Sequence, residues 1–500
     1  MTTTRNLSNR SADFVSVRDF GAVGDGITDD TAAFQAAVNY VKASTPGHME
    51  IHLQARKYNI AGTIIVDGPA RFVGEGMLDF QNSRPTTIPP NGSWMLHSST
   101  TAPMVTFTGD LGKNSGMVNI GIYQVGHPAP GVGWAPVVRN WVISNVDTYG
   151  TLTLSKVHFH NVYQGVNTIN AARPQYEDIT GQFFYRGFSF DAIYDLGKFE
   201  GLHAWTYWSE NDYVLQWQQA NAISITLLRV DGMWMDRIFA FAVETAVYVG
   251  NGVVGTGTAR AVFINGLYAD FTARALTVDA TLNAQVHVGS IFHLGQAWPG
   301  SPTTALPNSA GVDVASGTNH QIQIANIYSV LTKTYAIRVL GSNNQVWIGN
   351  GILEQYDFSN SGIGACYPIA TNLIYFGTPP GLSRYNAAPP YAVTGAPGGY
   401  VISQPKLVIT TNNVNNPVFA PGTAGNLAAF TVEGEATAGV ALAALTTGIV
   451  NVGATTNAIS FYGGASAVKG TLIGAKGGNV ALANLITYLA ARGLLTDSTT

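Results

Sequence analysis

The segment from Val15 to Tyr40 is the feature that most constrains the fold of this chain. It reads VSVRDFGAVGDGITDDTAAFQAAVNY, and its first residues alternate between apolar and polar as in a half-buried strand. Glycines then supply turn conformations, and Asp29, Asp30 or Thr31 can cap a helix. The helix is predicted over residues 31–43, with an apolar face formed by Phe34, Ala37, Val38 and Val41. Such a face needs a partner, so the segment predicts a module that covers one end of a larger structure.

The motif DFGAVGDGITDDTAAFQAAV closely resembles the N-terminal motif of pectate-lyase-like right-handed parallel β-helices, which include polygalacturonases and phage tailspikes. In that family the helix covers the first coil of the solenoid. A stack of coils otherwise leaves an unpaired apolar end that aggregates. The resemblance implies an all-β fold, a single-stranded right-handed parallel β-helix with an N-terminal capping helix, and it specifies chemistry only weakly.

Composition fits a long solenoid and excludes some partners. Charged residues make up 11% of the chain, against about 25% in typical chains, and there are 56 glycines. The net charge is -4 and no Lys/Arg-rich run occurs, so nucleic acid is not expected as a partner. Neither a secretion signal nor an 18-residue apolar stretch is visible, so we expect no membrane insertion.

Cysteine usage and motif content predict no cofactor and no metal. Cys366 is the only cysteine, so an intrachain disulfide is excluded, and we expect an ordinary buried thiol. No HExxH motif, EF-hand loop or paired-cysteine site is present.

Apolar-x-x-apolar corners recur through the middle of the chain at spacings of 22 to 39 residues, which fits β-helix coils with occasional loops. The flanking segments alternate with period two, which favours strands. The corners are Met117/Ile120, Leu154/Val157, Tyr176/Ile179, Phe199/Leu202, Ile225/Leu228, Ile264/Leu267, Val288/Ile291, Ile324/Ile327 and, less regularly, Ile348/Ile352.

This register predicts which side chains point inward and which form rows on the outside. Inward positions are Phe159, Gly181, Ala204, Val230, Ala269, His293 and Ser329. One outward row is predicted to contain His158, Thr180, His203, Arg229 and Tyr268. The other is predicted to contain His160, Gln182, Trp205, Asp231 and Asp270.

Four regions are predicted along the chain. They are residues 1–45 with the first strand and capping helix, 46–375 with the β-helix, a Pro/Gly-rich linker at 376–400, and a C-terminal trimerisation or receptor-binding domain at 401–500. The last domain should contain short strands and end in a helix from about Asn479, with an apolar stripe at Leu482, Leu485, Ile486 and Leu489 and a stop at Gly493.

The tail, with FYGGASAVKGTLIGAKGGN before it, is similar to a C-terminal segment of bacteriophage tail-fibre and tailspike proteins. That resemblance implies a homotrimer in the virion tail, with bacterial cell-surface polysaccharide and other phage tail proteins as partners. Because no secretion signal is visible, we expect the chain to fold in the host cytoplasm. A trimer would bury the terminal stripe and place several sites on one surface.

Aromatic and acidic residues concentrate between Pro174 and Arg237, where 14 of 64 residues are aromatic, about twice the average of the chain. Aromatic rings suit the apolar faces of sugars, although stacked aromatics also fill β-helix cores. The predicted substrate-binding residues are Trp205, Tyr207, Trp208, His203, Arg229 and Tyr268.

Glycoside hydrolysis needs two carboxyl groups, and neighbouring coils about 4.8 Å apart can supply them. Glu177 with Glu200, or Asp231 with Asp270, are predicted at equivalent positions on adjacent coils. Glu210 or Asp212 can alternatively supply the acid, and all six can also be solvated charges.

A lyase would instead use a base and a cation, for which His203, Arg229 and Tyr268 are predicted. The NTD, GHG and RIK motifs of polygalacturonases and the DPHD motif of alginate epimerases are absent. The leading hypothesis is therefore a tailspike that binds and hydrolyses a capsule, exopolysaccharide or O-antigen. The alternatives are a non-catalytic glycan-binding fibre, a lyase acting by β-elimination, and a cellular pectate-lyase-like enzyme.

Overall fold

The computed structural model describes residues 14–44, 49–77, 86–89, 91–112, 115–299, 304–359, 365–368, 371–377, 380–384, 399–402, 470–474, 477–491 and 495–499. The chain divides into two compact units, residues 1–427 and 428–500. The predicted strands at 403–469 lie outside the described residues.

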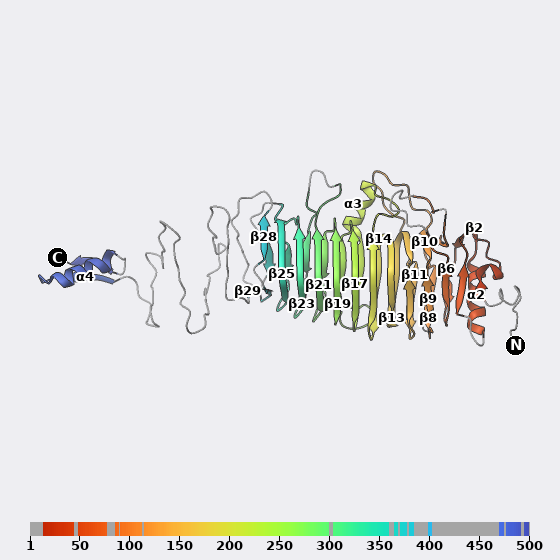
Figure 1. Cartoon of the computed structure of the whole chain (residues 1–500), viewed down its shortest axis with the longest axis horizontal. Helices are drawn as coiled ribbons and strands as arrows, with labels where there is room; N and C mark the ends of the chain where they lie inside the picture. The colour runs from red at the N-terminus through yellow and green to blue at the C-terminus, as the bar shows by residue number, and fades with distance from the viewer. Residues whose placement is uncertain are drawn as a thin grey trace, which may run out of the picture. The chain divides into compact units, whose positions relative to one another are not determined.

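The first unit is a parallel β-helix in which each coil contributes strands to three parallel ladders (Figure 1). The first ladder contains β1 (Val15–Ser16), β3 (Glu50–Leu53), β6 (Arg71–Gly74), β9 (Ser115–Val118), β12 (Leu152–Ser155), β14 (Gln175–Tyr194), β15 (Gly197–Ala204), β17 (Met233–Phe241), β19 (Val262–Asp270), β21 (Gln285–Leu294), β23 (Gln321–Val330), β25 (Gln345–Tyr356), β27 (Leu373–Phe376) and β29 (Gly399–Ile402).

The second ladder turns a corner from the first and uses the C-terminal halves of the long strands β15 to β25. It begins with β2 (Asp25–Asp29), β4 (Lys57–Ile60), β7 (Trp94–His97), β10 (Gly121–Gln124) and β13 (His158–Ala172), passes through β14, and ends at β28 (Gly381–Arg384).

The third ladder closes each coil. It contains β5 (Ile64–Val66), β8 (Val105–Gly109), β11 (Ile143–Thr148), parts of β13 and β14, β16 (Ile223–Leu227), β18 (Thr245–Val249), β20 (Arg274–Val278), β22 (Ala310–Val314), β24 (Ile337–Val339) and β26 (Cys366–Pro368).

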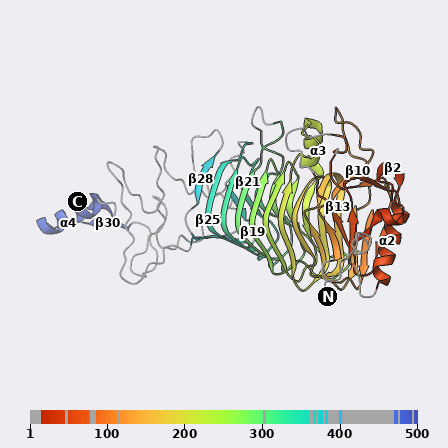
Figure 2. The ribbon, with the colours of Figure 1, turned by 45° about the vertical axis from the view of Figure 1, so that its right-hand side comes forward.

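The helix α2 (Thr31–Ala43) covers the N-terminal end of the coils, as the sequence predicts (Figure 2). Phe34 is fully buried and packs edge-on against Tyr58 in β4. The short 3-10 helix η1 (Val17–Phe20) precedes the glycine turn. The Asp29 carboxylate accepts from the N–H of Thr31, while Asp30 accepts from the N–H groups of Val23 and Gly24. Asp29, which precedes the N-cap residue Asp30, therefore binds the first N–H of the helix, and the Asp30 side chain fixes the turn.

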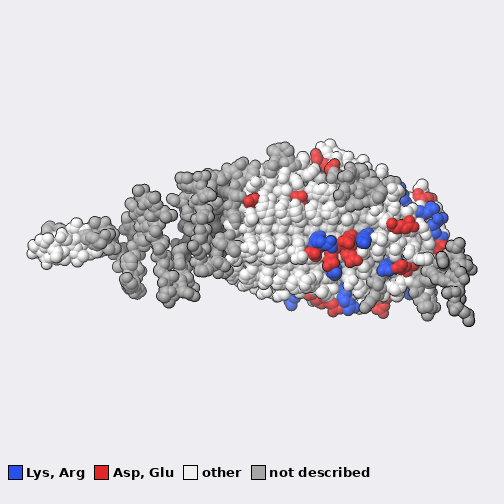
Figure 3. All heavy atoms as spheres, viewed as in Figure 1, with Lys and Arg blue, Asp and Glu red and all other residues white. Residues whose placement is uncertain are grey.

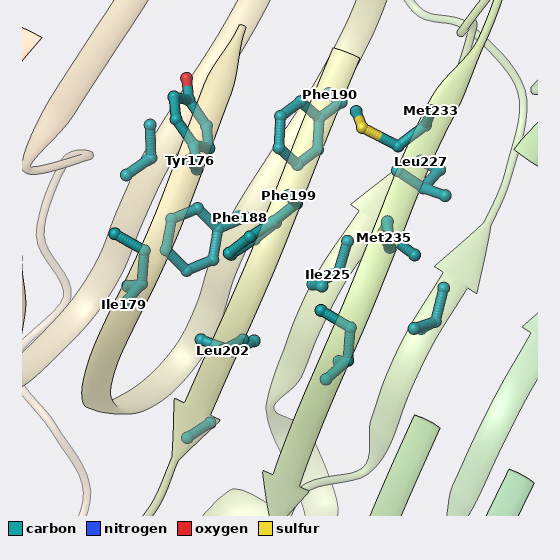
Figure 4. Close-up of a cluster of buried hydrophobic side chains, with 14 of the residues drawn as sticks. Tyr176, Ile179, Phe188, Phe190, Phe199, Leu202, Ile225, Leu227, Met233 and Met235 are labelled. Atoms are coloured by element: carbon teal, nitrogen blue, oxygen red, sulfur yellow. The ribbon is translucent and has the colours of Figure 1, made fainter. Parts of the chain in front are cut away.

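The core is a continuous stack of apolar side chains between the ladders, part of which Figure 4 shows. The first members of most predicted corners pair in register from Met117 to Ile348. The inward row follows the prediction at Phe159, Gly181, Ala204, Ala269, His293 and Ser329, but Ala240, and not Val230, lies between Ala204 and Ala269. Cys366 is buried, which raises the pKa of its thiol to about 12.

One predicted corner is wrong. Ile225 lies in β16 and pairs with Phe188 and Val247 in the third ladder. The position equivalent to Phe199 is Met235, which makes Met235/Ile238 the corner of this coil. Both pairs fit the apolar-x-x-apolar pattern, so the pattern alone does not identify the ladder. At the last corner Gly351, and not Ile352, pairs with Ile327.

The ladders extend beyond the predicted boundary at residue 375, because β28, within the predicted linker, pairs with β25, and β29, across its end, pairs with β27. The second unit contains β30 (Gly470–Gly474) and β31 (Leu495–Thr499), which pair in parallel and are joined through α4 (Val480–Ala491). The helix falls where it was predicted. Leu482 and Leu485 are exposed, and Ile486 is buried.

We expect the free energy of unfolding to fall as the pH is lowered from about 6.5 to about 4. Burial lowers the pKa of both His97 and His293 to about 4 in the folded protein. In the unfolded chain each imidazole titrates near 6.5, so in this window only the unfolded state binds the proton. Each histidine then removes about 1.4 kcal/mol of stability per pH unit. Urea unfolding followed by tryptophan fluorescence at several pH values measures this slope.

The variant His293→Gln removes one of these groups and should reduce the slope by the contribution of one histidine. Equal slopes for the variant and the unchanged protein would contradict this explanation.

Candidate functional site

Five outward side chains on consecutive coils form a continuous aromatic row on the second ladder, which we call row A. Row A consists of His203, Phe239, Tyr268, Phe292 and Tyr328, which pair in register. The successive ring centroids are 4.8, 5.1, 4.3 and 5.3 Å apart, with small angles between the ring planes. Because the rings stack along the solenoid, they present their edges to solvent, and Tyr268 is 41% exposed.

An open groove of about 610 Å³ lies over the N-terminal part of row A and the adjacent corner. Asp178, Arg237 and Ser290 line it together with His203 and Tyr268. Burial and the neighbouring Asp270 raise the pKa of the Tyr268 hydroxyl, which keeps it protonated. The groove therefore combines an apolar floor with polar groups at one edge.

The ion pair at the corner depends on a glycine between its partners. Arg237 Nη2 lies 3.6 Å from Asp178 Oδ1, with Gly201 on the coil between them. Gly201 has φ +74°, and a Cβ there would lie 3.0 Å from Asp178 Oδ1. Both charged side chains are more than half exposed, so the pair is solvated and weak. Arg237 can therefore exchange its partner for an anionic ligand.

Three carboxylates on consecutive coils form a second outward row, which we call the carboxylate row. Glu177 pairs in register with Glu200, and Glu200 with Asp236. The predicted equivalence of Glu177 and Glu200 is therefore confirmed. Lys198 lies 2.9 Å from Glu200, and Asn265 donates to Asp236 over 2.9 Å. Figure 3 shows acidic and basic side chains gathered in the middle of this face.

A second aromatic row runs along the first ladder, and we call it row B. In register it reads Lys198, Trp234, Phe263, His287, Gln323, Trp347 and Tyr375. Phe263 stacks on Trp234 at 5.1 Å and on His287 at 5.0 Å, and Trp347 stacks on Tyr375 at 5.5 Å. Gln323 interrupts the row. An open groove of about 650 Å³ lies along row B and includes Glu200 and Asp236 at one end.

The loop before α3 (Asp212–Asn221) lies against the start of row A, where Trp205 stacks on His203 at 5.9 Å. Figure 1 shows α3 at the edge of the coils. Asn211 caps the helix by accepting from the N–H of Tyr213. Trp205 is half-buried, with its ring 4.3 Å from Phe241, and remains at the surface as predicted.

The predictions that Tyr207 and Trp208 bind substrate at the surface are wrong, because both side chains are buried. The Tyr207 hydroxyl lies 2.6 Å from His203 Nδ1. Trp208 donates to the carbonyl of Thr86 and packs against Phe184. These residues hold the loop onto the coils. The same loop covers His158. Burial lowers the pKa of His158 well below its ordinary value.

Asp270 lies at the end of β19, paired in register with Phe241. Burial raises the pKa of its carboxyl, and a hydrogen bond from the Phe271 backbone lowers it only in part. Asp212, on α3, accepts from Trp298 Nε1 over 2.8 Å, and Trp298 packs against Phe241 and Phe271. Glu210 lies exposed before α3.

Arg229 and Asp231 do not join the predicted rows. Arg229 lies 2.8 Å from Asp231 and donates to the carbonyl of Ile193 at the end of the third ladder. The coil positions predicted for them belong to Phe239 and Phe241, because the corner of that coil is Met235/Ile238. The predicted pair of Asp231 with Asp270 and the grouping of Arg229 with His203 are therefore wrong.

Sequence reasoning missed three residues that the correct corner places in the grooves: Asp236 lines the groove along row B, and Arg237 and Phe239 line the groove over row A. The signal was the second apolar-x-x-apolar pair, Met235/Ile238. In the described part of the chain, no cluster of three or more His, Cys, Asp or Glu side chains is suited to a metal ion. None of the described helices has the length and apolarity needed to cross a membrane.

Comparison with known proteins agrees with the fold. A model of the family described as "Rhamnogalacturonase A/epimerase, pectate lyase-like" matches residues 14–124. With the three parallel ladders, this match shows a pectate lyase-like β-helix, the fold that the sequence motif predicted.

Two mannuronan C5-epimerases of Azotobacter vinelandii share a short segment with this chain. AlgE1 is 38% identical over 69 residues, and AlgE5 is 47% identical over 47 residues. These segments cover 12% and 9% of this chain, and only 5% and 4% of the two relatives.

Solved structures with a similar fold include an epimerase module and a tailspike. The A-module of the mannuronan C-5 epimerase AlgE4 of Azotobacter vinelandii has a TM-score of 0.47 and 15% identity, and the match covers 78% of this chain and 100% of that chain. The Dettilon tailspike protein has a TM-score of 0.38 and 11% identity, and the match covers 81% of this chain and 71% of that chain. At these identities the likeness concerns the fold alone.

Proposed function

We propose that this protein is a phage tailspike that binds a bacterial surface polysaccharide and cleaves it by hydrolysis. The observation that carries the proposal is the pair of outward rows in open grooves along consecutive coils. Binding groups that repeat every 4.8 Å or so along a groove match a polymer better than a small molecule. The resemblance of the N-terminal motif and of the tail to tailspike proteins supports the phage origin.

The carboxylate row supports hydrolysis. Equivalent positions lie about 4.8 Å apart on adjacent coils and about 9.6 Å apart two coils away. A retaining mechanism requires roughly 5 to 5.5 Å between carboxyl groups, and an inverting one roughly 6.5 to 9.5 Å. One carboxyl protonates the glycosidic oxygen as the C1–O bond breaks, and the other acts as a nucleophile on C1 or activates water. Glu177, Glu200 and Asp236 are the proposed catalytic set, with Asp270 as a further acid because burial raises its pKa.

We expect Glu200→Gln to slow the release of reducing ends by about 100-fold or more, since positioned acid–base groups contribute 10² to 10⁴. Binding of the polysaccharide should persist. Asp231→Asn is the matched control, because Asp231 pairs with Arg229 outside both grooves. Reducing-end assays on a panel of host polysaccharides measure the rates. Equal rates for the two variants would contradict the role of Glu200.

A second candidate function, β-elimination, is favoured by His203, Tyr268 and Arg237 lining one groove. Arg237 would neutralise a uronate carboxylate, and His203 would remove the proton at C5. The C4–O bond would then break, with Tyr268 protonating the leaving oxygen and a C4=C5 double bond forming. The segments shared with mannuronan C5-epimerases make an acidic polysaccharide a reasonable substrate to test.

If elimination occurs, both His203→Ala and Arg237→Ala should abolish the ultraviolet absorbance of the unsaturated product. Arg229→Ala should leave it unchanged, because Arg229 lies away from this groove. Reducing ends that form without this absorbance would exclude elimination. A polysaccharide that is bound and never cleaved would support the non-catalytic fibre instead.

We also propose that the protein is a homotrimer in the virion tail, where it contacts other phage tail proteins. The exposed apolar side chains of Val480, Leu482 and Leu485 on α4 support this assembly. Light scattering should give about three chain masses for the protein, and Leu485→Asp should shift the mass towards one chain. A monomer at all concentrations would contradict the trimer.

A further inference from the structure

We propose that the interruption of row B at Gln323 is a binding slot for one uncharged pyranose ring of the glycan. The slot has His287 and Trp347 as its walls and Gln323 as its base. The inference rests on the proposed function, because the ring would belong to the bound polysaccharide. It differs from that function in naming a site that lies apart from the cleavage residues.

The two walls face each other across one coil. His287 pairs in register with Gln323, and Gln323 with Trp347. His287 stacks on Phe263 with 15° between the ring planes, and Trp347 stacks on Tyr375 with 9°. One face of each wall is thereby occupied, and the other is directed towards the coil of Gln323.

The separation of the walls matches the thickness of one sugar ring. Two coils span about 9.6 Å, twice the spacing at which rings stack in these rows. A single ring between the walls can contact both of them at ordinary stacking distances. Within the stacks of rows A and B, aromatic neighbours cover each other's faces, and at the row ends Trp234 faces Lys198 and Tyr328 faces Ile352. The interruption therefore creates the one place in the described part of these rows where two ring faces lie opposite each other.

The base of the slot offers oriented polar groups. His287 Nδ1–H donates to the Gln323 amide oxygen over 3.1 Å, which fixes both side chains. The amide NH2 of Gln323 has no partner among the described residues, so it can donate to a sugar oxygen. Beside the slot, the groove is lined by Gly289, Ala325 and Gly349, whose small size leaves room for a ring.

The charge around the slot favours a neutral sugar. Glu200 and Asp236 lie at the other end of the same groove, and Asp236 is two coils away from His287. Of the described residues that line the groove from His287 to Trp347, none carries an acidic or a Lys/Arg side chain. A uronate would find no cation here, whereas hydroxyl groups would find the amide of Gln323 and the imidazole of His287.

Filling the slot is the most discriminating test. Gln323→Phe makes row B continuous from Trp234 to Tyr375 and adds an aromatic ring. If row B binds glycans simply as an aromatic surface, Gln323→Phe binds the sugar as well as the unchanged protein or better. If the sugar binds in the slot, Gln323→Phe loses this binding. Trp347→Ala removes one wall, and Trp347→Phe retains an aromatic wall. Tyr335→Ala is the control, because Tyr335 stacks on Tyr367 outside both grooves.

The probes are the methyl glycosides of glucose, galactose and mannose, with methyl glucuronide as the charged comparison. Saturation-transfer NMR on the full chain should give signals from C–H groups on both faces of at least one neutral ring. Gln323→Phe and Trp347→Ala should weaken this binding about tenfold, the effect of losing one ring contact. Trp347→Phe and Tyr335→Ala should retain it, and circular dichroism should be unchanged in all four variants.

The proposal is overturned if Gln323→Phe binds as well as the unchanged protein, or if no neutral glycoside binds. If the unchanged protein cleaves the polymer but binds no neutral glycoside, the slot is rejected and the proposed function stands. Binding in the slot without cleavage of any polysaccharide would reject hydrolysis and leave the slot standing.

Discussion

The parallel hydrogen bonding between consecutive coils is the constraint on which the rest of the structure depends. It fixes a spacing of about 4.8 Å and an exact correspondence between residues on adjacent coils. The same correspondence stacks Phe159, Gly181 and Ala204 inside and aligns Glu177 with Glu200 outside. One register therefore determines both the core and the candidate site, and a slip of one residue would exchange the inward and outward side chains.

The coil spacing also decides what an outward aromatic residue can do. Rings on neighbouring coils stack on each other, which stabilises the surface and hides the faces that sugars prefer. Row A runs without interruption from His203 to Tyr328, so it offers edges and hydroxyl groups. In row B a single Gln323 separates two stacks, so a polar residue, and not an additional aromatic one, makes ring faces accessible.

The sequence predicted the fold and much of the register, because the capping motif and the corner pairs are local patterns. It failed where two patterns competed, as with Ile225/Leu228 and Met235/Ile238 around the α3 insertion. It also misplaced Tyr207 and Trp208. Trp208 is buried by contacts with Thr86 and Trp134, and Tyr207 packs edge-on against His158, all of which are distant in sequence. The raised pKa of Asp270 likewise follows from packing that no local pattern reveals.

The α3 segment leaves the coil after β15 and returns at β16 without changing the pairing of β15 with β17. The coils thus stack in one dimension, and a loop can be inserted between two strands without changing how the coils pair. Exchange of residues 205–222 would remodel the cover over His203 at the start of row A while the strand pairing of β15 with β17 stayed the same. Glycan specificity and folding can therefore evolve on different segments of the same chain.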